Sequence, residues 1–128
     1  MISEEQVRAS LARYVELVGA GDIDGILALY AEDATVEDPV GKPPYVGIEA
    51  ISRFYREGLG RLDATARLDG SIRATRNCGA VPFCVDLDWG GSLRTIEVID
   101  VMEFDAEGRI RSMKAYWGES NMIAREQP

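Results

Sequence analysis

Two long stretches of alternating apolar and polar residues, joined by a glycine pair, constrain the fold of this chain most. The first stretch spans 80–89 and the second spans 96–104, with Gly90-Gly91 between them. One face of the first stretch carries Val81, Phe83, Val85, Leu87 and Trp89. A period of two is typical of half-buried strands, and paired glycines suit a tight turn. The sequence therefore predicts a long β-hairpin with one face in the core.

One acidic residue interrupts the apolar face of the second strand. At the strand period that face is Ile96, Val98, Asp100, Met102 and Phe104. Burial disfavours the charged form of a carboxyl group and raises its pKa. Asp100 is therefore expected either to bond to backbone groups or an Arg, or to act as a neutral hydrogen-bond donor.

The rest of the chain divides into helical patterns followed by strand patterns. Ser3 opens a capping box before a helix to Val18, which Gly19 and Gly21 end. Asp22 caps a second, short helix whose apolar spacing reaches Tyr30, and a third helix runs from Ile48 to Leu59. Further strands are expected at 35–38, 62–68, 71–76 and 109–117. This order predicts an α+β fold, in which three N-terminal helices pack on a curved antiparallel sheet, as one domain over 1–128.

Charge and composition restrict the partners. With 14 Lys and Arg against 22 Asp and Glu, the formal net charge is −8, which argues against nucleic acid and anionic membranes. The polar, acidic start is unlike a secretory signal, and no apolar run is long enough to span a membrane. Cys78 and Cys84 have no metal or redox spacing and are expected to be reduced thiols in a cytoplasmic protein, with a disulfide between them as the alternative.

The chain contains no His. A Ser-His-Asp triad, a Cys-His pair and a His-ligated metal site are therefore excluded, and no metal or cofactor is expected. Acid–base chemistry has to come from Asp, Glu, Tyr, Lys or Cys side chains, or from the chain termini.

Five titratable side chains lie on faces that should be buried: Tyr14, Tyr30, Asp38, Tyr55 and Asp100. Each has a structural explanation, because core tyrosines are common and Asp38 before Pro39 suits a turn. Together they indicate a division of labour, in which one carboxylate removes a proton while a neutral acid and a tyrosine donate to an oxygen. The matching reaction is proton abstraction beside a carbonyl, through an enolate.

Several segments carry a resemblance to a known family. They are Ala12–Val18, Tyr30–Pro39, Phe54–Arg56, Val98–Met102 and Ala115–Trp117. In this order, and along essentially its whole length, the chain resembles the bacterial ketosteroid isomerases (steroid delta-isomerases). The resemblance implies the cone-shaped fold of nuclear transport factor 2, a homodimer, and conversion of 3-oxo-Δ5 steroids to 3-oxo-Δ4 steroids.

The resemblance also implies a role for individual residues. Asp38 would move a proton from C4 to C6, and Tyr14 and a protonated Asp100 would donate to the C3 oxygen; this family is itself a standard example of a neutral Asp donor. Tyr30 and Tyr55 would hold Tyr14 through hydrogen bonds. An apolar slot would be lined by Val18, Phe54, Val81, Phe83, Val98, Met113 and Trp117.

Other functions of the same fold remain open at this point. A polyketide cyclase would also use a carboxylate base. Epoxide hydrolases of this fold would use an Asp-Arg-Asp arrangement, and no Arg lies on a clearly inward face of the relevant segments. Dehydratases like scytalone dehydratase would require His. A non-catalytic small-molecule-binding or dimerisation module is the alternative from another class.

Overall fold

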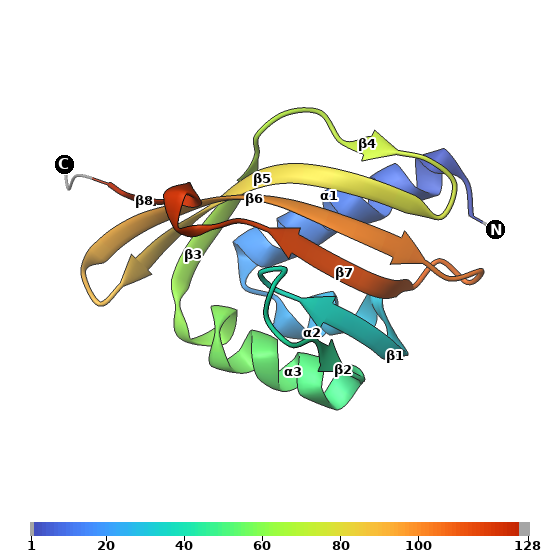
Figure 1. Ribbon diagram of the computed structural model, residues 1–128, viewed down its shortest axis with the longest axis horizontal. Helices are drawn as coiled ribbons and strands as arrows, with labels where there is room; N and C mark the ends of the chain where they lie inside the picture. Colours follow the sequence, from blue (N-terminus) through green and yellow to red (C-terminus); the bar gives the residue numbers. More distant parts are fainter. Residues whose placement is uncertain (1, 126–128) are drawn as a thin grey trace.

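Three helices cover one face of a curved sheet in the computed structural model, which describes residues 2–125 (Figure 1). The helices are α1 (Glu4–Ala20), α2 (Ile23–Ala28) and α3 (Ile48–Glu57), with 3-10 turns at Leu59–Arg61 and Glu119–Asn121. The strands are β1 (Tyr30–Glu37), β2 (Tyr45–Val46), β3 (Asp63–Leu68), β4 (Arg73–Ala74), β5 (Cys78–Trp89), β6 (Ser92–Phe104), β7 (Ile110–Tyr116) and β8 (Met122–Ala124). The expected α+β class is confirmed. No helix within residues 2–125 has the length and apolar character needed to cross a membrane.

The first helix begins and ends at the expected signals. The Ser3 hydroxyl accepts a hydrogen bond from the Gln6 amide, and the Gln6 side chain accepts one from the Ser3 amide, which completes the capping box. Gly21 ends α1 in a left-handed conformation, with φ of +66°. Between these caps, one stripe of the helix is buried, including Leu11, Tyr14 and Val18. The stripe faces the sheet and places the Tyr14 hydroxyl over its inner surface.

The β5–β6 hairpin is the longest pairing in the sheet. Its turn contains Gly90 and Gly91, whose positive φ angles of +61° and +91° suit a two-residue hairpin connection. The register pairs Val81 with Asp100 and Phe83 with Val98. All four side chains are buried on the inner face. The alternation therefore places Asp100 where the sequence predicts, although Trp89, at the end of the same pattern, is 60% exposed.

The sheet is mixed, because β1 and β7 run parallel. The order along the sheet is β2-β1-β7-β6-β5-β3, and the other pairs are antiparallel. Parallel neighbours need a long connection, and here more than 70 residues of helix and hairpin separate the two strands. From the sequence, an antiparallel sheet was expected. The parallel pair could not be predicted, because local alternation carries no information about which distant strands become neighbours.

Tyr30 lies on a strand and not on the second helix, which corrects the sequence interpretation. α2 ends at Ala28, and Tyr30 is the first residue of β1, paired with Ile110 of β7. The Ile110 amide donates to the Leu29 carbonyl at 2.8 Å, so sheet pairing captures the backbone where a longer helix would have continued. Tyr30 is nevertheless buried, as its apolar neighbours suggested. The short strand expected at 35–38 is thus the end of a longer one.

Three smaller features complete the fold. Cys78 is half-buried and Cys84 is buried, and both are free thiols. β8 was not expected from the sequence; it is a three-residue edge strand on Arg94–Ile96 of β6, too short to show a period. The third helix stops at Glu57, and a 3-10 turn replaces its expected last turn.

Gly79 allows α1 to approach the start of β5 closely. A Cβ atom added there would lie 2.6 Å from the Leu11 Cδ1 atom and 2.9 Å from both the Val7 Cγ1 atom and the Arg73 carbonyl oxygen. These distances are shorter than normal van der Waals contacts, and one of them is to backbone. Only a residue without a side chain fits here while the helix keeps its position.

We therefore expect Gly79→Ala to lower the free energy of unfolding by about 1–3 kcal/mol, the usual effect of overpacking a core. Urea denaturation followed by circular dichroism measures this change. Gly118→Ala is the matched control, because its Cβ atom would meet nothing closer than 4.0 Å. Equal stability of the two variants would contradict the proposed steric role.

Candidate active site

A largely apolar cavity of about 260 Å³ lies between the inner face of the sheet and the helices. Four polar side chains reach its wall: Tyr14, Asp38, Tyr55 and Asp100. They come from α1, the residue after β1, α3 and β6. Trp117, which follows β7, closes part of the same wall. Residues far apart in the chain thus meet around one space.

Three tyrosine hydroxyl groups form a continuous chain of hydrogen bonds at one side of the cavity. The Tyr55 oxygen lies 2.8 Å from that of Tyr14 and 2.7 Å from that of Tyr30. All three residues are almost fully buried. Burial is the main cause that raises the pKa of each hydroxyl well above its ordinary value. The three tyrosines are therefore neutral, and Tyr14 keeps a proton that it can donate into the cavity.

The Asp100 side chain is buried and receives no hydrogen bond from the described residues. Its side chain is 2% exposed, and within residues 2–125 no group hydrogen-bonds to its Oδ1 atom. Neither a backbone amide nor an Arg among these residues bonds to the Asp100 carboxyl group. The purely structural role that the sequence left open for Asp100 is therefore not observed. Burial, and secondarily the charge of Asp38, raise the pKa of Asp100 well above its ordinary value. The carboxyl group is thus held neutral, as a donor facing the cavity.

Asp38 has a different environment from Asp100. The Trp117 indole Nε1–H donates a hydrogen bond to the Asp38 Oδ1 atom at 2.8 Å. Burial raises the pKa of Asp38, but the Trp117 hydrogen bond and the positive charge of Lys42 act in the opposite direction. Asp100 has no such opposing contact. Of the two carboxyl groups at this cavity, Asp38 is therefore the one that ionises first.

The loop after Asp38 is anchored to β7. The Val40 amide donates to the Ala115 carbonyl at 2.8 Å, and Ala115 in turn pairs with Asp100 across the β6–β7 ladder. The backbone that carries Asp38 is thereby tied to the strands that carry Asp100 and lead to Trp117. The two carboxyl groups are positioned by one hydrogen-bonded framework.

The cavity wall contains most of the apolar residues that the sequence singled out. Val18, Phe54, Phe83, Val98 and Trp117 line the cavity. Val81 and Met113 do not; they are 0% and 1% exposed and belong to the core behind the wall. Alternation identifies a buried face, but it does not separate residues that pack into the core from residues that border a cavity.

The sequence analysis missed several residues of the wall. These are Gly58, Leu59, Leu62, Val85, Leu87 and Ile96. The last three lie on the apolar faces of β5 and β6, so their signal was present in the alternation. Leu59 and Leu62 lie in and beside the 3-10 turn after α3, where no periodic pattern marks a buried side.

Within the described part of the chain, no group of three or more Cys, Asp or Glu side chains is gathered so that it could hold a metal ion. The cavity offers two carboxyl groups, one of them neutral, and two phenols. This set can move a proton and can donate hydrogen bonds to an oxygen.

Comparison with known proteins gives one family and three relatives. The model of the SnoaL-like domain matches residues 11–113. A steroid Delta-isomerase of Nocardioides simplex is 42% identical over 118 residues, which cover 92% of this chain and 94% of that protein. The epoxide hydrolase LasB of Streptomyces lasalocidi is 32% identical over 97% of this chain, which spans 46% of LasB. An orange carotenoid-binding protein of Limnospira maxima is 35% identical over 54 residues, 42% of this chain and 17% of that protein.

The raised pKa of Asp100 predicts how stability changes with pH. The folded protein keeps a proton on Asp100 that the unfolded chain loses above about pH 3.9, so stability falls as pH rises from there to the folded pKa. Asp100→Asn cannot titrate. We expect the free energy of unfolding of the wild type to fall relative to this variant, by up to about 1.4 kcal/mol per pH unit within that window.

Urea denaturation of both proteins between pH 4 and pH 8 measures this difference. Because the other ionisable groups are present in both proteins, their contributions largely cancel. A difference in stability that stays constant over this range would show that Asp100 does not hold a proton in the folded state.

Proposed function

The chain belongs to the ketosteroid isomerase family of SnoaL-like domains, and on this premise we propose that it converts 3-oxo-Δ5 steroids to 3-oxo-Δ4 steroids. The observation that carries the proposal is the unequal pair of carboxyl groups at one apolar cavity, Asp38 and Asp100, with the Tyr14 hydroxyl on the same wall. One group can accept a proton while two others donate to an oxygen. No cofactor is needed for this chemistry.

The proposed reaction moves one proton within the substrate. The Asp38 carboxylate removes a proton from C4, and the electrons of the C–H bond form a C3–C4 double bond as the carbonyl π electrons move to the C3 oxygen. Tyr14 and protonated Asp100 donate hydrogen bonds to this oxygen, which carries negative charge in the dienolate. Asp38 then delivers the proton to C6, so that the double bond shifts and the acid returns to a carboxylate.

Magnitudes support two donors at the oxygen. Removal of one donor from a water-excluded oxyanion site costs about 2.7–4 kcal/mol of transition-state stabilisation in other enzymes. Both donors here are neutral and buried, so they retain their protons and are already oriented before the reaction. The apolar wall suits a hydrocarbon skeleton, whose burial contributes roughly 25 cal/mol per Å².

Trp117 has a positioning role in this scheme. Its indole N–H fixes the Oδ1 atom of Asp38 and leaves the other carboxylate oxygen for the substrate. The hydrogen bond also favours the ionised form of Asp38, which the proton transfer requires.

The cavity does not favour epoxide hydrolysis, although LasB is a relative. Epoxide hydrolases of this fold would use an Asp-Arg-Asp arrangement. Among the described residues, those that line the cavity include no Arg. A polyketide cyclase and a non-catalytic binding domain remain alternative functions, and the assay described next separates them from the isomerase.

We expect the wild-type protein to convert 5-androstene-3,17-dione to its conjugated isomer, which is followed by the ultraviolet absorbance of the enone. Asp38→Asn should lower the rate by about 10²–10⁴-fold, because a general base is typically worth that factor. Asp33→Asn is the matched control, since Asp33 is an exposed carboxylate of β1, the strand that leads to Asp38. The absence of isomerisation by the pure wild type would exclude the proposed function, and full activity of Asp38→Asn would exclude Asp38 as the base.

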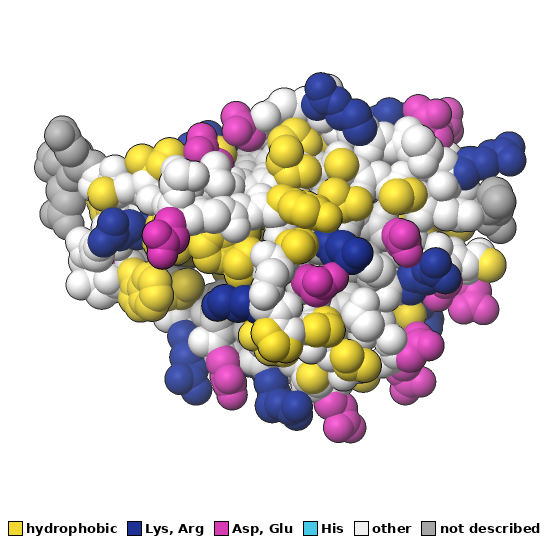
Figure 2. Space-filling view, viewed as in Figure 1, with side chains coloured by type: hydrophobic (Ala, Val, Ile, Leu, Met, Phe, Trp, Pro, Cys, Tyr) yellow, Lys and Arg dark blue, Asp and Glu magenta, His cyan; other side chains and the backbone are white. Residues whose placement is uncertain are grey.

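We also propose that the chain forms a homodimer through the outer face of its sheet. Figure 2 shows hydrophobic side chains gathered over the central strands on the side away from α1. Ile99 and Tyr116 pair across β6 and β7 and are 47% and 49% exposed. Pro82 pairs with Ile99 and extends the patch onto β5. Such a cluster of exposed apolar residues on a sheet is typical of a protein–protein contact.

We expect Ile99→Glu to shift the protein from dimer to monomer, because a buried unpaired carboxylate would oppose association. Light scattering coupled to size-exclusion chromatography gives the mass. Ala9→Glu adds the same charge on the exposed side of α1 and should leave the dimer intact. A monomeric wild type would contradict the proposal.

A further inference from the structure

A second hollow adjoins the proposed active site and has a different character. It is an open groove of about 570 Å³, lined by Trp89, Ser92, Arg94, Trp117, Glu119 and Met122. Trp117 belongs to both walls, that of the groove and that of the apolar cavity. The two hollows therefore share the Trp117 side chain as a common wall, and the groove lies on the side of the β5–β6 turn.

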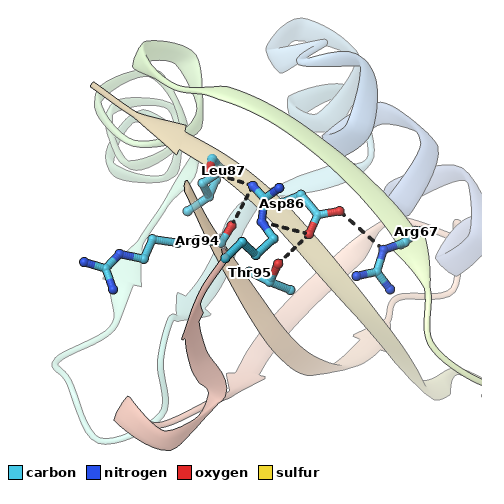
Figure 3. Close-up of polar contacts among 6 residues, drawn as sticks. Arg67, Asp86, Leu87, Arg94 and Thr95 are labelled. Carbon is cyan, nitrogen blue, oxygen red and sulfur yellow. Dashed lines mark hydrogen bonds and ion pairs between the residues drawn. The ribbon is translucent and has the colours of Figure 1, made fainter. Parts of the chain in front are cut away.

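Arg94 brings a positive charge to the inner side of the sheet at this end. Its neighbour Thr95 points to the outer face, where the Thr95 hydroxyl donates to the Asp86 carboxylate at 2.6 Å (Figure 3). Arg67 and Arg125 also contact Asp86 there. The Arg94 side chain extends away from this cluster, as alternation requires. Within residues 2–125 its guanidinium group makes no ion pair or side-chain hydrogen bond.

The inward-facing side chains of β6 from Arg94 to Asp100 form a row, which we call the binding track. Val98 and Ile96 lie between them on the same face and line the apolar cavity. Six residues of strand span about 20 Å at about 3.3 Å per residue. A steroid whose C3 oxygen meets Asp100 has to lie along Val98 and Ile96, because the core closes the opposite direction with buried Met102 and Phe104. Its far end, at C17, then leaves the cavity towards Trp117 and Arg94.

We propose that the groove binds a carboxylate-bearing side chain at C17 of the substrate, with Arg94 as the group that recognises the anion. The inference rests on the proposed function and names the substrate class for that site. The planar guanidinium group matches a carboxylate in a bidentate geometry, and the Ser92 hydroxyl on the same wall can add a hydrogen bond. The fused rings are shorter than the track, so a side chain is required to reach Arg94.

The charges around the groove make this recognition selective. The chain carries a formal net charge of −8 and repels anions in general. Glu119 also borders the groove, which leaves Arg94 as the only cationic side chain among the described residues that line it. Replacing Arg94 should therefore remove most of the preference for an acid.

The test is a binding measurement that does not depend on catalysis. The probes are a 3-oxo-Δ4 steroid with a short C17 side chain ending in a carboxylate, and the primary amide of the same acid. Binding is followed at low ionic strength by the fluorescence of Trp89 and Trp117, the two tryptophans of the chain. We expect the acid to bind about tenfold more tightly than the amide, and Arg94→Gln to bring the two affinities within about twofold.

Two control variants separate charge from fold. Arg94→Lys keeps the charge and should retain most of the preference. Arg109→Gln removes an exposed Arg beside the β6–β7 turn, at the other end of β6, and should leave the preference unchanged. Equal affinity of acid and amide in the wild type would overturn the inference, as would a preference that survives in Arg94→Gln.

The outcome distinguishes the inference from the proposed function. A wild type that prefers the acid through Arg94 but isomerises neither 5-androstene-3,17-dione nor a 3-oxo-Δ5 acid would support the groove and reject the isomerase. A wild type that isomerises the dione but binds acid and amide equally would support the isomerase and reject the groove.

Discussion

The site depends on one constraint, the burial of the Asp100 carboxyl group without a hydrogen-bond partner among residues 2–125. A carboxyl group on an inner sheet face loses its hydration, and the protein avoids the cost of a buried charge by keeping the group neutral. The long β5–β6 ladder makes this possible, because it holds Asp100 opposite Val81 and between Val98 and Met102, where only 2% of the residue is exposed. The same strand that forms the core thus supplies an acid with its proton in place.

The helices are linked to the sheet at the point where this acid faces the cavity. Tyr14 comes from α1, Tyr30 from β1 and Tyr55 from α3, so their hydrogen bonds join three elements that are separate in sequence. Each hydroxyl is buried and would be costly to leave without a partner. The arrangement therefore fixes the relative positions of two helices and an inner strand while it orients Tyr14, and the architecture and the geometry of the site are set by the same bonds.

Much of this organisation is visible in the sequence, because it follows from local periodicity. The alternation from 80 to 104 places Asp100 on the inner face, and the helical stripe of α1 places Tyr14. What could not be predicted depends on distant contacts. The parallel pairing of β1 with β7 moved Tyr30 from a helix to a strand, and the irregular turn after α3 hid Leu59 and Leu62 from any periodic pattern. Val81 and Met113 show the converse limit, since a pattern that marks burial does not reveal where a cavity stops. Arg94 follows the same alternation as Asp100. Its proposed role in binding could be inferred only from the structure, in which Trp117 lines both hollows.

The chain of three tyrosine hydroxyls has a polarity as well as a geometry. Each hydroxyl has one proton, so when Tyr14 donates a hydrogen bond to an oxygen in the cavity, Tyr55 has to donate to Tyr14 and Tyr30 has to donate to Tyr55. The three O–H dipoles then point the same way and strengthen one another. A ligand that can only donate a hydrogen bond would leave the Tyr14 proton without an acceptor in the cavity, unless that proton turned to Tyr55 and the whole row reversed. The cavity therefore favours a ligand that accepts a hydrogen bond from Tyr14 over one that donates to it. This preference depends on a residue as remote as Tyr30.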